Sequence, residues 1–466
     1  MNKTNFILCL LLYVFKVHSQ NVITIEKVNE LVFLNSNEIK IINNNYQQLN
    51  IEADFYNLSL LPKISSSINL PYQRSISEVI QSDGSQRFIE RNFINSSFNL
   101  NISQVLPFTG GIVSVSSSVN GSRDFNNEIS SFSSNWANIS YQQTLNGSNS
   151  FKWNKKLNFL TIKKNSLNYI KERIKLKYEL SKVYVETQLL QLKTNMIAEN
   201  IKKTKNILFE LEEKFKFGRT IKLEVEQTKM TLEQLNRQFE ISNLEYLAGI
   251  QLLKREMGTD FDFELQAVEQ NDFLIDKKEL KAAIKSNGFD LDKTIQLLEI
   301  ESNIEKVKKE GAITVNMQLG MGLNSTSNDL ANLYDTPSQS QFLTIGAKIP
   351  ILDWGMSKKK YAIVKLQKDN LEFEFLKNEN KMEEQLDNLS NYKASLIFQI
   401  KSLKEQIVLS KNIEEMFTQL LKLGRKTITE YKNQLAESYN ILVEHQKAVN
   451  DLYLLKLKIN EFNLIF

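Results

Sequence analysis

Cysteine, histidine and proline are scarce in this chain of 466 residues. It contains one cysteine, two histidines and five prolines. Cys9 and His18 lie near the N-terminus, so the rest of the chain holds only His445 and no cysteine. These counts exclude cysteine nucleophiles and zinc sites built from Cys and His. A glycine-rich phosphate loop and a Gly-x-Ser-x-Gly elbow are also missing, so we expect no enzyme activity, cofactor or metal.

An excess of charge and long apolar runs are missing as well. The chain has 58 Lys and Arg against 54 Asp and Glu, which gives a net charge of +4. Lysine is mixed with glutamate throughout, so we expect no nucleic-acid partner. No run approaches the roughly 18 apolar residues that a membrane helix needs.

The first 19 residues differ from the rest. Lys3 precedes the apolar run Phe6–Phe15, and Val17 and Ser19 supply the small residues of a cleavage site. This pattern predicts a secretory signal peptide over 1–19, because the apolar run is too short to span a bilayer.

Two long stretches are free of glycine and proline, Ser148–Phe217 and Met356–Leu423. Apolar residues recur in them at steps of three and four, as in Ile170, Ile174 and Tyr178. Helices of about 65 residues would be about 98 Å long, which exceeds a globular core and predicts coiled coils.

Four shorter helical stretches of about 35 residues each are expected, and each would be about 53 Å long. They cover about Ile25–Leu60, Arg219–Met257, Ile275–Glu310 and Thr427–Phe462. Two of them placed end to end match one long helix. The chain is therefore expected to hold two internal repeats, 20–257 and 275–466, joined by a linker at 258–274.

The windows at about 62–146 and 312–351 alternate with period two. In the second window the apolar positions include Ile313, Val315, Met317, Leu319, Leu343, Ile345 and Ala347. Strands with one apolar and one small polar face are typical of an outer-membrane barrel, although a soluble antiparallel sheet packed on helices gives the same alternation. The first window shows four such segments, with a tight turn at 107–111 between the middle two.

A Gly-Arg turn interrupts the helical pattern at two places about 206 residues apart. The sequence FKFGRTIKLEVEQ contains Gly218, and LKLGRKTITEYKNQ contains Gly424. An acid follows six positions after each glycine, namely Glu224 and Glu430. Glycine permits the left-handed backbone that ends many helices, so the pattern predicts a hairpin turn near 218 and another near 424.

Several segments together resemble the TolC-type outer-membrane efflux protein family. They are LLPKISSSINL (Leu60–Leu70), VLPFTGG (Val105–Gly111), KIPILDWGMSKKK (Lys348–Lys360) and the paired Gly-Arg turns. The resemblance covers nearly the whole chain after the signal peptide. It keeps the family's order twice: half helix, strands, long helix, turn, half helix.

The resemblance implies an α+β membrane protein with an outer-membrane β-barrel shared by a homotrimer and a long α-helical coiled-coil tunnel in the periplasm. The function implied is that of a tripartite efflux system's outer-membrane channel, a passive exit duct for small molecules such as drugs. Outer-membrane lipid, a periplasmic adaptor (membrane fusion) protein and an inner-membrane pump are the implied partners. A type I protein-secretion conduit, or a secreted coiled-coil structural or adhesive protein, are the alternatives.

The resemblance also implies roles for the turns. It assigns adaptor docking to the tips, at Gly218, Arg219, Gly424 and Arg425. It places a periplasmic gate at Glu430 and Asn433, where an amide replaces the family's second acid. An ordinary helix stop and a solvated glutamate explain the same residues without either function.

The number of barrel strands is left open by the sequence. The family has four strands per chain and twelve per trimer. The longer first window of this chain suggests six per chain and about 18 per trimer, unless the extra hairpin lies outside the wall.

Overall fold

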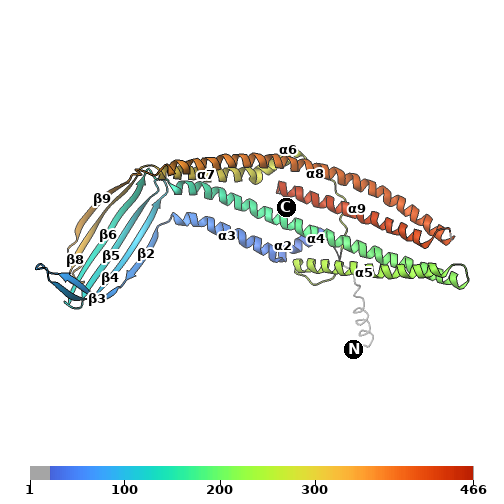
Figure 1. Ribbon diagram of the computed structural model, residues 1–466, viewed down its shortest axis with the longest axis horizontal. Helices are drawn as coiled ribbons and strands as arrows, with labels where there is room; N and C mark the ends of the chain where they lie inside the picture. Colours follow the sequence, from blue (N-terminus) through green and yellow to red (C-terminus); the bar gives the residue numbers. More distant parts are fainter. Residues whose placement is uncertain (1–20, 424, 465–466) are drawn as a thin grey trace, which may run out of the picture. The chain divides into compact units, whose positions relative to one another are not determined.

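The computed structural model describes residues 21–423 and 425–464 (Figure 1). The predicted signal peptide, 1–19, and Gly424 lie outside the described residues. Contacts divide the chain into two compact units. The helical-hairpin unit runs to Tyr46 and includes Ser166–Gly288 and the chain from Glu379 onward, whereas the sheet unit comprises Gln47–Asn165 and Phe289–Asn378.

The long helices repeat with the same lengths. Helices α4 (Ser150–Lys216) and α8 (Met356–Lys422) both have 67 residues, and α5 (Lys222–Met257) and α9 (Ile428–Asn463) both have 36. Corresponding ends are about 206 residues apart, which is the spacing of the two Gly-Arg turns. The long glycine-free and proline-free stretches therefore form helices of about 100 Å, as the periodicity predicts.

The first short helical stretch is not continuous, which corrects the expectation of one helix over Ile25–Leu60. It is divided into α2 (Ile25–Asn35) and α3 (Asn37–Ser59). The N–H of Ser36 donates to Val32 O at 2.9 Å, and the Ser36 hydroxyl accepts from the N–H of Glu38 at 3.1 Å. Ser36 thus ends one helix and caps the next, which is a position that serine favours.

The third short stretch is interrupted too. Helix α6 (Lys277–Ile284) continues through η1 (Lys285–Phe289) into α7 (Asp290–Glu310). Gly288 has a φ of 148° there, a conformation that glycine adopts without strain. The expected single helix over Ile275–Glu310 is therefore kinked at Gly288.

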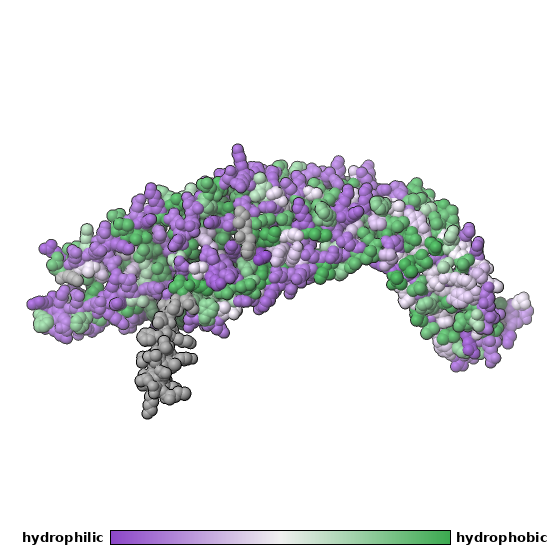
Figure 2. Space-filling model, turned by 180° about the vertical axis from the view of Figure 1, so that it is seen from behind, coloured by the Kyte–Doolittle hydropathy of each residue, from purple (hydrophilic) through white to green (hydrophobic). Residues whose placement is uncertain are grey.

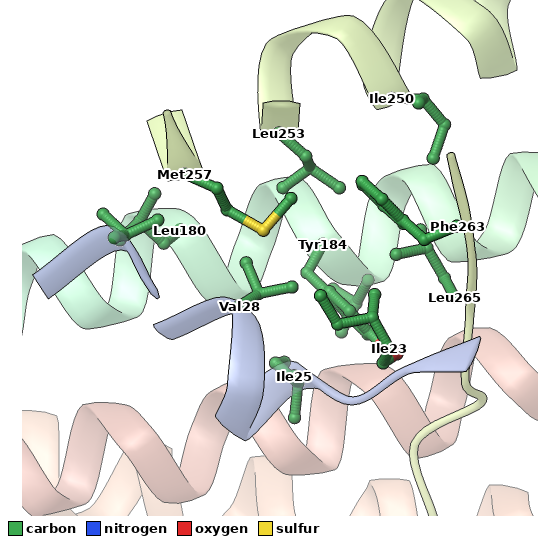
Figure 3. Packing of buried hydrophobic residues seen from close by; sticks show 12 residues of the cluster. Ile23, Ile25, Val28, Leu180, Tyr184, Ile250, Leu253, Met257, Phe263 and Leu265 are labelled. Atoms are coloured by element: carbon green, nitrogen blue, oxygen red, sulfur yellow. The ribbon is translucent and has the colours of Figure 1, made fainter. Parts of the chain in front are cut away.

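The helical-hairpin unit has an apolar core around Tyr184, which is fully buried (Figure 3). The Tyr184 hydroxyl lies 2.8 Å from the carbonyl oxygens of both Ile23 and Gln266. Strand β1 (Asn21–Ile23) pairs in parallel with β7 (Phe263–Leu265) beside it. The segment expected to be a plain linker at 258–274 thus contributes a strand to the core.

The sheet unit contains one antiparallel sheet (Figure 1). Its strands are β2 (Lys63–Asn69), β3 (Tyr72–Ile80), β4 (Gln86–Leu106), β5 (Gly111–Asp124), β6 (Ile129–Leu145), β8 (Thr314–Ser327) and β9 (Ser338–Lys348). The order across the sheet is β2-β4-β5-β6-β8-β9, and β3 pairs with the first part of β4. The first window therefore holds five strands instead of the four expected, and β3 is the strand that was missed.

The alternation places unlike side chains on the two faces of the sheet. Cross-strand partners in one row are Ile64, Ile102, Val115, Ile139, Met321 and, at its β9 end, Gln341. The neighbouring row on the other face comprises Ser65, Asn101, Ser116, Asn138, Gly322 and Ser340. One face is thus mainly apolar, whereas the other carries mainly small polar side chains.

Candidate functional site

The first hairpin turn is built around a left-handed glycine. Gly218 has a φ of 66°, and its N–H donates to Phe215 O at 2.9 Å. The N–H of Arg219 donates to Lys214 O at 2.8 Å, which satisfies a carbonyl at the end of α4. No heavy atom lies within 4 Å of a Cβ built at Gly218, so backbone conformation alone selects glycine here.

The second turn has equivalent hydrogen bonds at equivalent positions. The N–H of Arg425 donates to Leu420 O at 2.9 Å, as that of Arg219 does to a carbonyl five residues earlier. The N–H of Leu423 donates to Gln419 O at 3.1 Å. Arg219 and Arg425 therefore both lie at turns between a long and a shorter helix.

The helices that follow the turns begin differently. In α9 the Thr427 hydroxyl accepts from the N–H of Glu430 at 3.3 Å, and the Glu430 carboxylate accepts from the N–H of Thr427 at 2.9 Å. These bonds form a capping box, which satisfies two free donors at a helix start. Helix α5 has no side-chain cap at Ile221, although the Thr220 hydroxyl donates to the Glu224 carboxylate.

Local contacts dominate the electrostatics of Glu430. The Lys426 ammonium lies 2.6 Å from its carboxylate. This hydrogen bond, followed by those from the Thr427 amide and hydroxyl, lowers the pKa of Glu430 to about 2. Asn433 is exposed three residues further along α9, so the two predicted gate residues share one side of the helix. The contacts within one chain give Glu430 a structural role as a cap.

The turns also expose apolar side chains, which the sequence reasoning missed. Hydrophobic residues lie among hydrophilic ones at this end of the helical hairpins in Figure 2. Phe217 and Leu423 directly precede the two glycines and are 73% and 68% exposed. Phe215, Ile221 and Leu223 are also exposed beside the first turn. The signal was present in the sequence as apolar residues next to glycine, where a helix end leaves them without a packing partner.

Among residues 21–423 and 425–464, no group of His, Cys, Asp and Glu side chains is suited to hold a metal ion. No helix in this part has an apolar stretch long enough to cross a lipid bilayer.

Similarity to known proteins comes from solved structures, since neither a protein-family model nor a curated protein sequence matches the chain. The CmeC outer membrane channel of Campylobacter jejuni aligns with 95% of this chain and 86% of its own, with a TM-score of 0.67 and 15% identity. The outer membrane protein VceC of Vibrio cholerae aligns over 94% and 96%, with a TM-score of 0.67 and 8% identity.

The open state of the Neisseria gonorrhoeae MtrE outer membrane channel aligns over 94% of this chain and 88% of its own, with a TM-score of 0.62 and 12% identity. At these identities the alignments establish the fold. The long helices and the antiparallel sheet confirm the fold class that the family resemblance implied. The chain has the TolC-like fold of solved outer-membrane channels.

Proposed function

We propose that this protein is the outer-membrane channel of a tripartite efflux system and works as a homotrimer. It is a passive duct through which small molecules pass from the periplasm to the exterior. The TolC-like fold supports this proposal because the solved structures that share it are outer-membrane channels. The sequence holds no nucleotide-binding loop, so the energy for export comes from an inner-membrane pump.

The observation that carries the proposal is the apolar face of the sheet. Ile64, Leu343 and Ile345 are 70%, 64% and 64% exposed in the single chain. Soluble monomers rarely expose a contiguous apolar surface of more than a few hundred Å². Lipid is the environment that suits strands with one apolar and one small polar face.

The hairpin tips are the proposed contact with a periplasmic adaptor. Gly218 and Arg219 form one tip, and Gly424 and Arg425 form the other. Three chains would present six tips of equivalent backbone construction, which suits an adaptor ring with sixfold symmetry. The exposed Phe217 and Leu423 add apolar surface to each tip.

Glu430 and Asn433 are the proposed gate residues. Threefold symmetry would bring three copies of Glu430 around one axis. Negative charges around a narrow opening raise the local concentration of cations. Their attraction for cations is stronger where little water is present. The Lys426 ammonium reduces this effect wherever its contact with Glu430 persists.

Membrane extraction and export together test the function. The protein should leave isolated outer membranes only with detergent, as a trimer that dissociates on heating. A strain that lacks it should accumulate an exported dye such as ethidium. A water-soluble rod released without detergent would contradict the proposal. Normal dye export combined with loss of a secreted protein would identify a protein-secretion conduit instead.

A further inference from the structure

The two repeats differ in the number of strands between the half helix and the long helix. The chain enters the sheet in the same way in both, through 60–62 from α3 into β2 and through 311–313 from α7 into β8, but in the second repeat β8 and β9 alone lead to α8. In the first repeat, β5 and β6 hold the corresponding place before α4. Strands β2, β3 and β4 precede them and have no counterpart in the second repeat. The sheet is thus four repeated strands with an addition at one edge.

The added strands occupy the edge of the repeated set. Strand β4 pairs with β5 along Phe93–Leu106 and Gly111–Asp124, so the outer edge of β5 is covered along the whole strand. The other edge of β4 is covered by β2 and β3 in succession. Pro71 lies between those two strands, and an edge is where a sheet tolerates proline. Among the described strands, the outer edges of the sheet are therefore β2 with β3 on one side and β9 on the other.

The two edges are compatible with each other. Every neighbouring pair across the sheet is antiparallel, and the path contains six strands, so β2 and β9 run in opposite directions. Strand β9 of one copy is therefore oriented to pair antiparallel with β2 of another. Membrane barrels have at least eight strands, so six cannot close within one chain. Exposed edges without a partner would promote aggregation.

We propose that three copies close a wall of 18 strands, in which β9 of each copy pairs with β2 of the next. The trimer in this inference rests on the proposed function. Each edge of the sheet is thus paired with a strand from another copy of this chain. The wall thus differs from the twelve strands implied by the family resemblance, because β4 covers the edge of β5 that a twelve-stranded closure would need.

The added strands would widen the exit. With strands about 4.8 Å apart and tilted by about 40°, 18 strands give a wall about 36 Å across between backbones, against about 24 Å for twelve. Four helix ends adjoin the sheet in each copy, those of α3, α4, α7 and α8. Twelve helices spaced about 9 Å apart in a ring would span about 35 Å. An 18-stranded wall therefore matches the width of the helices that lead into it.

The middle of this wall would be lined by small, uncharged side chains. The polar face carries serine, asparagine, glycine, threonine and glutamine on most rows. Its charged residues lie near the ends of strands, namely Lys63, Lys348, Asp124 and, in the first part of β4 that pairs with β3, Arg87 and Arg91. Such an exit admits bulky solutes of either charge, and any charge preference arises elsewhere in the duct.

A pair of cysteine variants tests the position of β4. Asn101 on β4 and Ser116 on β5 are cross-strand partners on the polar face. Each is changed to cysteine, and 2-sulfonatoethyl methanethiosulfonate is added from the exterior side during planar-bilayer recording. We expect both Asn101→Cys and Ser116→Cys to shift the reversal potential toward cation selectivity by similar amounts, because both line the same lumen. Val115→Cys on the apolar face is the control that should not respond.

The outcomes separate this inference from the proposed function. If Ser116→Cys responded to the reagent and Asn101→Cys did not, β2 and β4 would lie outside the wall. That result would overturn the inference but leave the channel function intact. A density map of the wild-type trimer gives the second measurement. We expect 18 strands, and a wall of twelve would overturn the inference. If no variant and no wild-type protein formed trimeric channels, the proposed function itself would fail.

Discussion

The Lys203 ammonium lies 2.5 Å from the Glu414 carboxylate and so joins α4 of the first hairpin to α8 of the second. The two side chains are 30% and 21% exposed. Nζ of Lys203 also lies 5.8 Å from the centre of the Tyr439 ring on α9. Burial lowers the pKa of Lys203, but the hydrogen bond and the charge of Glu414 outweigh it, and the pKa is raised overall. This ion pair thus connects the two repeats.

Removing either partner should destabilise the protein. We expect Glu414→Gln and Lys203→Met each to lower the free energy of unfolding by about 1–3 kcal/mol. A half-buried charge loses its nearest partner, and in Glu414→Gln the Lys203 ammonium keeps only the exposed Glu199 at 3.4 Å. The double variant should lose less than the sum of the two, which a double-mutant cycle in urea measures. Glu213→Gln breaks the exposed Lys216–Glu213 pair and should cost at most about 1 kcal/mol. Equal effects at both pairs would show that the Lys203–Glu414 pair contributes no more to stability than an exposed ion pair.

The same pair predicts a dependence on alkaline pH. A lysine whose pKa is raised by folding adds stability that is fully present below its unfolded pKa of about 10.4. That stability is lost as the pH rises through the folded value. Wild-type protein should therefore lose more stability than Glu414→Gln between about pH 10 and 12, as thermal unfolding at several pH values would show.

Tyr184 offers a test of the core beside the short strand pair. Its buried hydroxyl lies within hydrogen-bond distance of the carbonyl oxygens of Ile23 and Gln266. These two residues belong to segments far apart in the sequence. Tyr184→Phe should cost about 1–3 kcal/mol, because these carbonyls lose a donor in a buried place. Tyr72→Phe, at an exposed position on β3, is the comparison and should change stability little. A loss below about 0.5 kcal/mol at Tyr184 would mean that water replaces the hydroxyl.

The helices were largely predictable from the sequence because their signals are local. Spacing of apolar residues and the absence of glycine and proline located α4 and α8, and the Gly-Arg pairs located both turns. Local signals for the breaks were present as well, in Ser36 and in the Asn-Gly pair at Gly288. Neither break was predicted, because each short helical stretch was expected to be one helix about half as long as α4 or α8.

The order of the strands was not predictable in the same way. Alternation shows which residues share a face, but not which strand lies beside which, because pairing joins distant segments. The placement of β2 and β3 on the same edge of β4 depends on the length of β4. The pairing of β1 with β7 likewise joins residues on either side of a whole repeat. The surroundings of Glu430 were also missed, although Thr427 and Glu430 have the spacing of a capping box.

The apolar face of the sheet can be tested with one arginine on each face. Met317 lies on the apolar face, and Gln318 beside it lies on the polar face. Met317→Arg should cost about 2–4 kcal/mol if it lies near the middle of the bilayer, because lipid cannot solvate the charge. Gln318→Arg should be tolerated, since its side chain would face water. Heat resistance of the assembled trimer is the measurement, and equal tolerance of both changes would contradict the assignment of faces.

The first turn can be altered without touching the rest of the chain. Gly218→Val puts a β-branched residue at a positive φ, which costs about 1–2 kcal/mol. Asparagine tolerates this conformation, so Gly218→Asn is the matched control. We expect Gly218→Val trimers to assemble but to export poorly and to crosslink weakly to the adaptor, with Gly218→Asn close to wild type. Poor assembly with normal adaptor crosslinking would show that Gly218 serves folding and not docking.

Glu430 allows the gate hypothesis to be separated from helix capping. Glutamine can replace glutamate in a capping box, so Glu430→Gln should leave α9 intact while removing the charge. We expect it to weaken cation selectivity and block by multivalent cations in planar bilayers, and this effect should shrink near 1 M salt, where the screening length is about 3 Å. Glu224→Gln at the equivalent position of the first repeat is the control. Equal effects from the two variants, or no effect at Glu430, would leave Glu430 as a capping residue only.

The pH dependence of that selectivity shows which interaction dominates at Glu430. Lys426 and Thr427 hold its pKa at about 2 in the single chain. A carboxyl with a depressed pKa contributes its capping stability above the unfolded value of about 4.3 and loses it as the pH falls through the folded value. If these contacts persist in the trimer, the selectivity should survive at pH 4 and decline only toward pH 2. Repulsion among three close carboxylates acts in the opposite direction and raises their pKa. Reversal potentials measured from pH 7 to pH 2 distinguish the two, and a midpoint above about 4.5 would show that Lys426 has left Glu430 in the assembled ring.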